Sequence, residues 1–533
     1  MPLCNLRLLP TMGGMEPGSP ALRGFADLHN HQFADLGFGR KAVWGRALGP
    51  VETALGSCSP LHGPFGSCDV VDAMVRLAYL RRLPSPHTHG KIGRARWPSW
   101  DTFTHQSVHQ DWLRRAVDGG LRLMVMLALN DEWLARTLRA PKADRPDMVN
   151  VERQLQAAYD FQDAIDADAG GEGLGWYRVV HTPAEAWTAI ADGKLAVVLG
   201  VEVSALFGMH AEDVAPAELD TRVSELEDAL QAWYDKGVRY VFPVHFGDNG
   251  FGGGAFDNPL IRDMDSPWLS RANPPLTLGP YRVSTVDGSA HGLRYRGGRR
   301  NRTGLTGLGR HLISMLMDRG MLFDLNHMSL QMRDEVLFLC EERDYPPVAG
   351  HSAFLDICAG NRRTEAHLTS AELERIRALN GMLGMILGQG SKHDVAPWRG
   401  REPSRLRSFT TSRALVHAYE YAVAALPGLP VAIGSDLNGF ATLPGPRFGG
   451  GSRDDDATRL PYPFQGPSGV ELDRSTIGDR VLDLNEDGLC HVGMLPDLVA
   501  DLSRVGSPSL DLEPLHGSAA GFVALWERAR VAR

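Results

Sequence analysis

Short runs of apolar residues recur along the chain, and polar segments with helical periodicity separate many of them. Runs that are apolar at almost every position are typical of strands buried on both faces, as in parallel sheets. The pattern therefore predicts parallel strands rather than the alternating strands of a half-exposed sheet. The eight runs are GFADL (24–28), LRLMVML (121–127), AVVLGV (196–201), RYVFPV (239–244), MLFDL (321–325), PPVAG (346–350), MLGMIL (382–387) and PVAIG (430–434).

Several of the intervening segments carry signals for helices. One apolar stripe, at alternating steps of four and three, predicts an amphipathic helix before the strand at 239–244. Thr369 and Glu372 have the spacing of a capping box, and Gly381 stands where that helix is expected to end. Eight strands that alternate with helices predict a (β/α)₈ (TIM) barrel. The stripe consists of Leu219, Val223, Leu226, Leu230 and Trp233.

Two long regions interrupt the pattern, at about 36–118 and 247–303. The first is rich in Gly, Pro, His and Arg, and the second shows little periodicity. Because both follow strand ends, we expect them to be insertions at the C-terminal face of the barrel. From about 440 the chain passes through a Gly/Pro/Asp stretch into the helical pattern HVGMLPDLVADLSRVG. We therefore expect residues 1–533 to form a single barrel domain with a C-terminal helical extension.

Composition excludes several classes of protein. The 533 residues are 43% hydrophobic and 22% charged, which is typical of a globular chain with a large core. A net charge of −9 and the lack of a large basic cluster argue against a nucleic-acid partner. A membrane span needs roughly 18 unbroken apolar residues, and we find no such window. The N-terminal sequence has no long apolar core after a charged segment, so we expect a cytoplasmic protein.

Cysteine is scarce, with six residues in the chain. Cys58 and Cys68 lie close together in the loop CSPLHGPFGSC. They could form a local disulfide, and the alternative is two thiols in a reducing compartment.

Polar residues at the strand ends carry the candidate chemistry. The carboxyl ends of barrel strands converge on one mouth, so residues that follow them should lie close together. Imidazole nitrogens and carboxylate oxygens are ligands for divalent metals. In chain order these residues are His29, His31, Glu202, His245, His327, His351 and Asp436.

Each of these residues also has a simpler interpretation. A single histidine at a strand end is often just a hydrogen-bonded polar residue, Glu202 could pair with an arginine, and Asp436 could cap the next helix. His29 and His31 are two apart in a strand, so they can face the same ion. The same spacing in HTH at 87–89 falls in a Pro/Gly-rich stretch, which we interpret as a loop. Together, five histidines and two carboxylates would be costly to bury without a metal, which favours a metal site.

These segments resemble the renal or membrane dipeptidases, peptidase family M19 of the amidohydrolase superfamily. The resemblance covers most of the barrel, and it rests on the order of the motifs as well as on each one. The matching segments are GKLAVVLGVEVS, GVRYVFPVHFGDN, GMLFDLNHMS, PVAGHSAF and VAIGSDLNG.

The resemblance implies a binuclear zinc centre. His29, His31 and Asp436 would hold one ion and His327 and His351 the other, with Glu202 as the bridge. It further implies a metal-bridging hydroxide as nucleophile, Asp436 as general base and then acid, and His245 as the group that stabilises the oxyanion.

The resemblance also implies an arginine that binds the carboxylate of the substrate. Arg363 is our first candidate and Arg362 the second, since the spacing from His351 is one residue longer than usual; a solvated arginine pair is the alternative. Two positions depart from the family. His31 stands where these dipeptidases usually carry aspartate, and Asn438 stands in place of a second carboxylate.

The sequence therefore predicts a zinc-dependent hydrolase that cleaves an amide bond in a dipeptide or a small N-acyl amino acid. The same fold could instead act on a lactone or a phosphoester, and a non-catalytic binding protein is a further alternative. We expect a small-molecule or dipeptide substrate, with no nucleic-acid or membrane partner. Homodimers are usual among the enzymes it resembles, and the sequence leaves the oligomeric state open.

Overall fold

The eight predicted strands all form and pair in one parallel sheet. The computed structural model describes residues 23–76, 97–211, 218–256, 285–291, 293, 299–358, 363–388, 411–449 and 456–532. The strand order is β8-β5-β4-β2-β1-β11-β10-β9. The bounds are β1 (Phe25–Asn30), β2 (Leu121–Asn130), β4 (Leu195–Val203), β5 (Val238–Val241), β8 (Leu322–Phe323), β9 (Val348–Ser352), β10 (Met382–Ile386) and β11 (Val431–Gly434).

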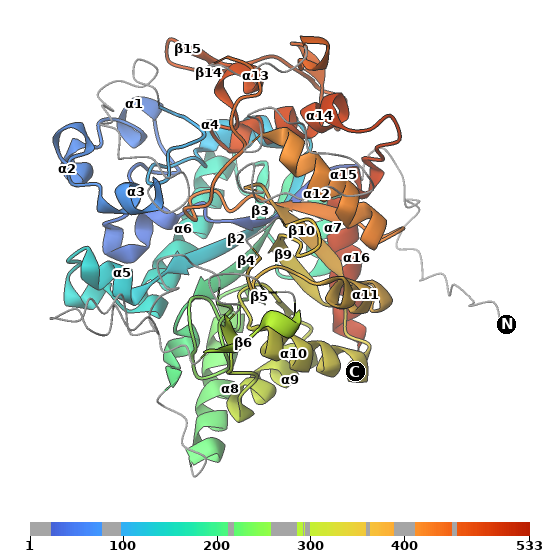
Figure 1. The fold of residues 1–533 in the computed structure, drawn as a ribbon. Coiled ribbons are helices and arrows are strands. Elements are labelled where there is room, and N and C mark those ends of the chain that lie inside the picture. Colours follow the sequence, from blue (N-terminus) through green and yellow to red (C-terminus); the bar gives the residue numbers. More distant parts are fainter. Residues whose placement is uncertain are drawn as a thin grey trace.

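The two outer strands of this order also meet, which closes the sheet. Asp324, directly after β8, forms a parallel bridge with Val348 of β9. The N–H of Leu325 donates to the carbonyl of Val348 at 2.9 Å. Helices surround the ring of strands, as Figure 1 shows. The predicted (β/α)₈ barrel is therefore confirmed.

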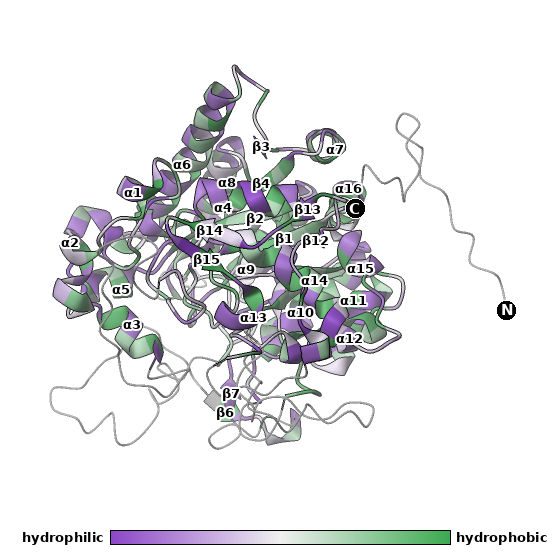
Figure 2. Ribbon diagram, turned by 90° about the horizontal axis from the view of Figure 1, so that it is seen from above, coloured by the Kyte–Doolittle hydropathy of each residue, from purple (hydrophilic) through white to green (hydrophobic). Residues whose placement is uncertain are grey.

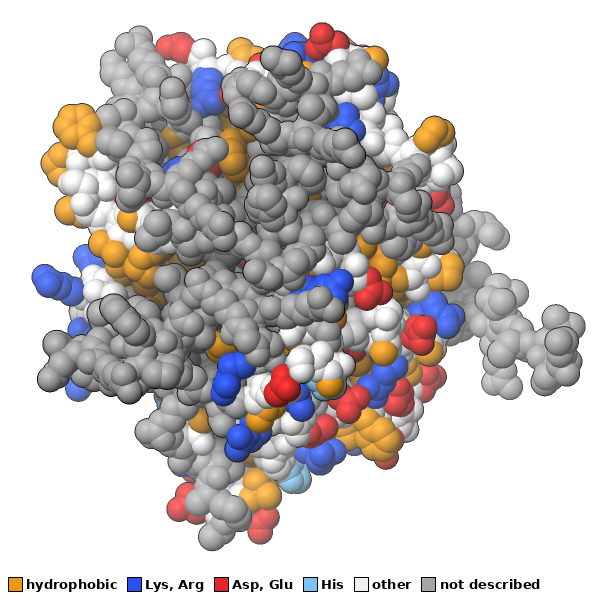
Figure 3. Space-filling view, viewed as in Figure 1, with side chains coloured by type: hydrophobic (Ala, Val, Ile, Leu, Met, Phe, Trp, Pro, Cys, Tyr) orange, Lys and Arg blue, Asp and Glu red, His pale blue; other side chains and the backbone are white. Residues whose placement is uncertain are grey.

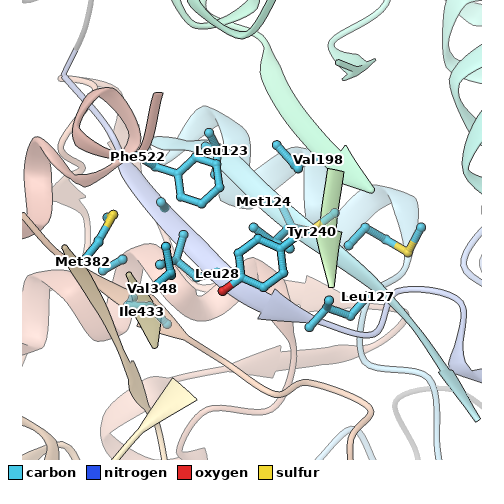
Figure 4. Packing of buried hydrophobic residues seen from close by; sticks show 14 of the residues in the cluster. Leu28, Leu123, Met124, Leu127, Val198, Tyr240, Val348, Met382, Ile433 and Phe522 are labelled. Atoms are coloured by element: carbon cyan, nitrogen blue, oxygen red, sulfur yellow. The ribbon is translucent and has the colours of Figure 1, made fainter. Parts of the chain in front are cut away.

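Burial on both faces explains why apolar and polar residues do not alternate along the strands. All nine residues of β4 are buried, and in β2 Arg122 alone is partly exposed. Side chains on one face fill the barrel, and those on the other pack under the helices. Figure 4 shows part of this core, in which Leu123, Val198, Val348 and Ile433 lie around Tyr240.

The helices follow the barrel strands and cover their outer face. The helices of the described residues are α1 (Val51–Ala54), α2 (Ser59–His62), α3 (Val70–Val75), α4 (Gln110–Asp118), α5 (Glu132–Thr137), α6 (Asp147–Asp168), α7 (Pro183–Ala191), α8 (Leu219–Asp235), α9 (Gly307–Asp318), α10 (Leu330–Arg343), α11 (Ser370–Ala378), α12 (Ser412–Ala425), α13 (Leu484–Asp487), α14 (Leu495–Val505), α15 (Glu513–His516) and α16 (Ser518–Val531).

Both helix predictions that named residues are confirmed. Helix α8 buries Leu226 and Leu230 of the predicted stripe. The capping box of α11 forms in both directions: the Thr369 hydroxyl accepts from the N–H of Glu372 at 3.2 Å, and the Glu372 carboxylate accepts from the N–H of Thr369 at 2.8 Å. The turn after α11 uses Asn380, with φ 51°, as its left-handed residue rather than Gly381.

One strand of the barrel sheet was not predicted from the sequence. β3 (Tyr177–Val179) pairs in parallel with the first half of β4, while β5 pairs with the second half on the same side. Three residues with a partly exposed Arg178 in the middle are too short to give a periodic signal.

The extension at the C-terminus closes one end of the barrel. The N–H of Gly24 donates to the carbonyl of His516, and the N–H of Ala26 donates to the Ser518 hydroxyl at 2.8 Å. Helix α16 therefore lies against the start of β1, at the N-terminal ends of the strands. Its Phe522 is fully buried and lies 6.4 Å from Tyr240, ring centroid to ring centroid. The C-terminal ends of the strands are at the opposite end.

The regions predicted as insertions contain short elements. Between β1 and β2 the chain forms α1, α2 and α3, which lie together at one edge of the molecule in Figure 2. The predicted range 36–118 also includes α4, which precedes β2. In the second region β6 (Thr285–Asp287) and β7 (Arg299–Asn301) form an antiparallel hairpin. This hairpin was not predicted, because the region shows little periodicity.

The stretch after residue 440 contains two small antiparallel pairs before α14. They are β12 (Phe464–Gln465) with β13 (Glu471–Leu472), and β14 (Ser475–Ile477) with β15 (Arg480–Leu482). Among the described helices none is long and apolar enough to cross a membrane. Acidic and basic side chains are mixed on the face seen in Figure 3. Cys58 and Cys68 form no disulfide: Cys58 is buried and Cys68 exposed.

Candidate metal centre

The barrel brings all six candidate ligands to the C-terminal ends of its strands. His29 lies in β1, and His31 follows its last residue; Glu202 lies in β4 and His351 in β9. His327 follows β8, and Asp436 follows β11. The strands therefore position the six side chains, although 407 positions separate the first from the last.

One half of the cluster is formed by the histidines of β1 and two carboxylates. The Nε2 atoms of His29 and His31 are 3.0 Å apart. Glu202 Oε2 lies 3.1 Å from Nε2 of His29 and 3.2 Å from Nε2 of His31. Asp436 Oδ1 lies 3.6 Å and 3.2 Å from the same two nitrogens. The pair predicted from the spacing of His29 and His31 thus faces one point.

The other half uses the second oxygen of Glu202. Glu202 Oε1 lies 3.1 Å from Nε2 of His327, whose Nε2 is 3.0 Å from Nε2 of His351. The ring centroids of His29 and His351 are 3.9 Å apart, so the two halves adjoin. A single carboxylate therefore stands between two pairs of imidazoles, with one oxygen toward each pair.

The donor set fits divalent cations. His31 Nδ1 donates to the carbonyl of Leu127 at 3.0 Å, which leaves the lone pair of its Nε2 directed at Glu202 and Asp436. Buried acceptors that face one another repel unless a proton or a cation lies between them. Glu202 Oε1 accepts no hydrogen bond from the described residues. Metal bonds of about 2.0–2.2 Å hold tetrahedral ligand atoms roughly 3.3 Å apart, close to the spacings seen here.

The electrostatics of the cluster agree with this fit. Burial lowers the pKa of His31, but hydrogen bonds and charges from Asp436 and Glu202 outweigh burial and raise it to about 10. Burial raises the pKa of Glu202, yet the electrostatic interaction with His29 and the hydrogen bonds from His29 and His31 bring it well below its usual range. The carboxylates thus strongly attract positive charge at this point, which a metal ion would supply in place of a proton.

Two further buried carboxylates, which the sequence analysis missed, hold the ligand-bearing segments. Asp27 accepts from the N–H and the hydroxyl of Ser435, at 2.8 and 2.6 Å. Asp324 accepts from the hydroxyl of Tyr240 at 2.6 Å and from the N–H of Gly350 at 2.9 Å. The sequence carried a signal for both residues, because each is an aspartate inside an apolar run. A carboxylate buried in a strand needs hydrogen-bond donors around it.

The backbone at two candidate ligands is strained. His327 and Asp436 have φ of 64° and 52°, in the left-handed region that residues other than glycine rarely adopt. Such conformations cost of order 1 kcal/mol each and collect at functional sites.

Asn438 ties the loop after β11 to β1 and to the insertion. Its Nδ2 donates to the carbonyl of His31 at 3.0 Å and to Oε1 of Gln106 at 2.7 Å. Its Oδ1 accepts from the N–H and the hydroxyl of Ser107, at 2.9 and 2.7 Å. In this chain Asn438 is therefore a bracing residue behind His31.

His245 lies beside the cluster, as predicted. Its Nε2 is 3.8 Å from Glu202 Oε1, and its ring centroid is 4.6 Å from that of His327. Burial lowers the pKa of His245 to about 3, so the ring is neutral at physiological pH.

The structure describes one of the two predicted arginines. Arg363 Nε donates to the carbonyl of Cys358 at 3.1 Å. Arg362 and the HTH sequence at 87–89 lie outside the described residues. A substrate-binding role for either arginine stays a prediction.

The fold and the cluster define a (β/α)₈-barrel protein with a histidine and carboxylate centre at the C-terminal ends of its strands. No protein-family model and no curated protein matches the chain. Among solved structures it is similar to the dipeptidase AC, a metallopeptidase of family M19, with 19% identity, a TM-score of 0.45, and 79% of this chain and 89% of that one covered.

Two other solved structures are similar to a comparable extent. A metallopeptidase from Rhodobacter sphaeroides, bound to a phosphinate mimic of the dipeptide L-Ala-D-Ala, shares 18% identity, with a TM-score of 0.46 and coverage of 78% and 89%. An amidohydrolase from Pseudomonas aeruginosa shares 16% identity, with a TM-score of 0.43 and coverage of 79% and 93%.

Proposed function

We propose that this chain is a binuclear zinc-dependent hydrolase that cleaves an amide bond in a dipeptide or a small N-acyl amino acid. The observation that carries the proposal is the position of Glu202, whose two oxygens each lie 3.1 Å from a different histidine, His29 and His327. One buried carboxylate between two imidazole pairs is suited to bridging two ions.

The proposed ligands divide into two sets around this bridge. His29, His31 and Asp436 would hold one ion, and His327 and His351 the other. When bound, two zinc ions would polarise the scissile carbonyl and lower the pKa of water toward neutrality.

Asp436 is suited to moving the proton during hydrolysis. The side chain of Asp436 is 14% exposed, whereas those of His29, His31 and Glu202 are at most 2% exposed. The carboxylate thus faces both the cluster and the mouth of the barrel. In the proposed reaction it takes a proton from the attacking water and passes it to the leaving amine.

His245 and an arginine would bind the substrate. Because His245 is neutral and lies beside His327, an N–H of its ring can donate to the negative charge that develops on the carbonyl oxygen. Arg363, or Arg362 as the second candidate, would pair with the carboxylate of the substrate.

An assay panel tests the proposal. The zinc-loaded protein is given L,L- and L,D-dipeptides, N-acyl amino acids, lactones and phosphoesters, with Glu202→Gln as the matched inactive variant. We expect cleavage of at least one amide class that depends on Glu202. Fast opening of lactones or cleavage of phosphoesters without amide cleavage would assign the site to the alternative bond.

Metal analysis separates the enzyme from a non-catalytic binding protein. Protein purified without added zinc, or soaked in zinc, should contain close to two more ions per chain than Glu202→Gln. A difference well below two ions that soaking does not restore would contradict the binuclear centre.

A further inference from the structure

Three buried metal-binding side chains lie outside the barrel centre, in the chain between β1 and β2. Cys58, His62 and His105 each place a potential ligand atom within 4.8 Å of the other two. All three residues are only 2% exposed. Thiolate and imidazole are the ligands that closed zinc sites use, whereas magnesium and calcium prefer oxygen.

The local fold explains why Cys58 and His62 face the same point. Cys58 is the N-cap of α2, and His62 is the last residue of that helix. The N–H of His62 donates to the carbonyl of Cys58 at 2.8 Å. Residues four apart in a helical turn project from the same face, so the thiol and the imidazole are neighbours.

His105 reaches this pair from a segment that is 43 residues further along the chain. Trp44 and His105 form a parallel bridge, in which Trp44 N–H donates to the carbonyl of Thr104 and Gln106 N–H to that of Trp44, at 2.8 and 2.7 Å. The rings of His62 and His105 then meet edge to face, with centroids 4.8 Å apart.

The hydrogen bonding of His62 leaves the lone pair of its Nδ1 available to bind a metal. Its Nε2 donates to the carbonyl of Ala42 at 3.3 Å, so the lone pair is on Nδ1. Histidine ligands commonly donate their other N–H to a carbonyl in this way. Asp69 Oδ2 lies 3.4 Å from this Nδ1.

We propose that Cys58, His62 and His105 bind a structural zinc ion, with Asp69 as the fourth ligand. Zinc bonds of about 2.3 Å to sulfur and about 2.0 Å to nitrogen hold ligand atoms roughly 3.3–3.7 Å apart, so a small rotation of these side chains completes the site. Burial of all four side chains leaves no room for a substrate, which excludes a cysteine nucleophile and makes the site structural. Asp69 is 8% exposed.

The ion would fix the insertion against the mouth of the barrel. Asp69 is also the N-cap of α3, where its Oδ1 accepts from the N–H of Asp72 at 3.0 Å. His105 is followed by Gln106 and Ser107, which hydrogen-bond to Asn438 behind His31. One metal would therefore link α2, α3 and the segment that braces the candidate barrel ligand.

Cobalt substitution of the full-length protein tests this site apart from the barrel centre. The barrel ligands are nitrogen and oxygen only, so a near-ultraviolet absorption band from thiolate-to-cobalt charge transfer reports on cysteine coordination. We expect the band in wild type and in Cys68→Ser, which removes the exposed thiol of the same loop, and its loss in Cys58→Ser. Metal content should fall by one ion per chain in Cys58→Ser relative to Cys68→Ser.

The wild-type spectrum shows whether a cysteine coordinates cobalt, even if a variant fails to fold. A wild-type protein that binds cobalt without the band overturns the proposal, and so does a band that persists in Cys58→Ser. Glu202→Gln separates the two sites: it should lose metal from the barrel centre and keep the thiolate band. A failure of the hydrolase proposal would leave this result unchanged.

Discussion

Replacing Asn438 by aspartate tests whether the hydrogen bonds behind His31 require an amide. The substitution restores the carboxylate that the dipeptidases it resembles often carry at this position. Here Nδ2 of Asn438 donates to the carbonyl of His31 and to Oε1 of Gln106. An aspartate would face both acceptors with a negative oxygen.

Gln106 cannot relieve this conflict by turning its amide over. Its Oε1 also accepts from the N–H of Val108 at 2.9 Å, and its Nε2 donates to the carbonyl of Gln32 at 3.0 Å. Asn438 is 5% exposed, so water does not replace the lost donors. Each buried acceptor left without its donor costs about 1–3 kcal/mol, partly offset by stronger bonds from Ser107, and we expect a loss of about 3 kcal/mol.

Denaturant unfolding at neutral pH measures the loss. Asn380→Asp is the matched control, because Asn380 is also in the left-handed region but is exposed. The control should stay within about 0.5 kcal/mol of wild type. A loss below about 1 kcal/mol for Asn438→Asp would refute the assignment of an amide donor at this position.

Three further predictions concern the metal and the core. Glu202→Gln should weaken zinc binding by at least about 100-fold, measured as metal content after gel filtration, and full retention of zinc would contradict the bridge. Removal of zinc by a chelator should lower the melting temperature of the wild type, because a bound metal at about 1,000 times its Kd stabilises the fold by roughly 4 kcal/mol. Added zinc should restore the melting temperature, and magnesium should not. Phe522→Ala should cost about 3–5 kcal/mol in denaturant unfolding without a change in zinc content, because the side chain is fully buried far from the ligands.

The strands and the grouping of the candidate ligands could be predicted because both follow from simple rules. A strand buried on both faces must be apolar throughout, so β2 and β4 are visible as unbroken runs. The carboxyl ends of parallel strands meet at one end of the barrel, so residues as distant as His29 and Asp436 could be grouped without any contact being known.

The other features of the structure could not be predicted, because they depend on contacts that leave no local pattern in the sequence. Cys58 was considered as a partner for Cys68, but it lies beside His62 and His105, and the bridge at Trp44 that brings His105 there has no periodic signal. Asp27 and Asp324 stood inside apolar runs, where their partners Ser435 and Tyr240 come from other strands. β3 was too short to recognise.

The substitution of histidine for aspartate at position 31 alters the charge balance of the proposed centre. Glu202 and Asp436 contribute two negative charges and the four histidines none, so two zinc ions would leave a net charge of +2, against +1 with aspartate at position 31. The fold places further negative charge behind the ligands, since Asp324 has an oxygen within 4.8 Å of a ring nitrogen of His29 and of one of His351. A more positive centre favours an anionic group on the substrate, which is consistent with a substrate that carries a free carboxylate. The geometry suits His31 as a ligand of the proposed centre, because its Nδ1 is held by the carbonyl of Leu127 and its Nε2 faces both carboxylates.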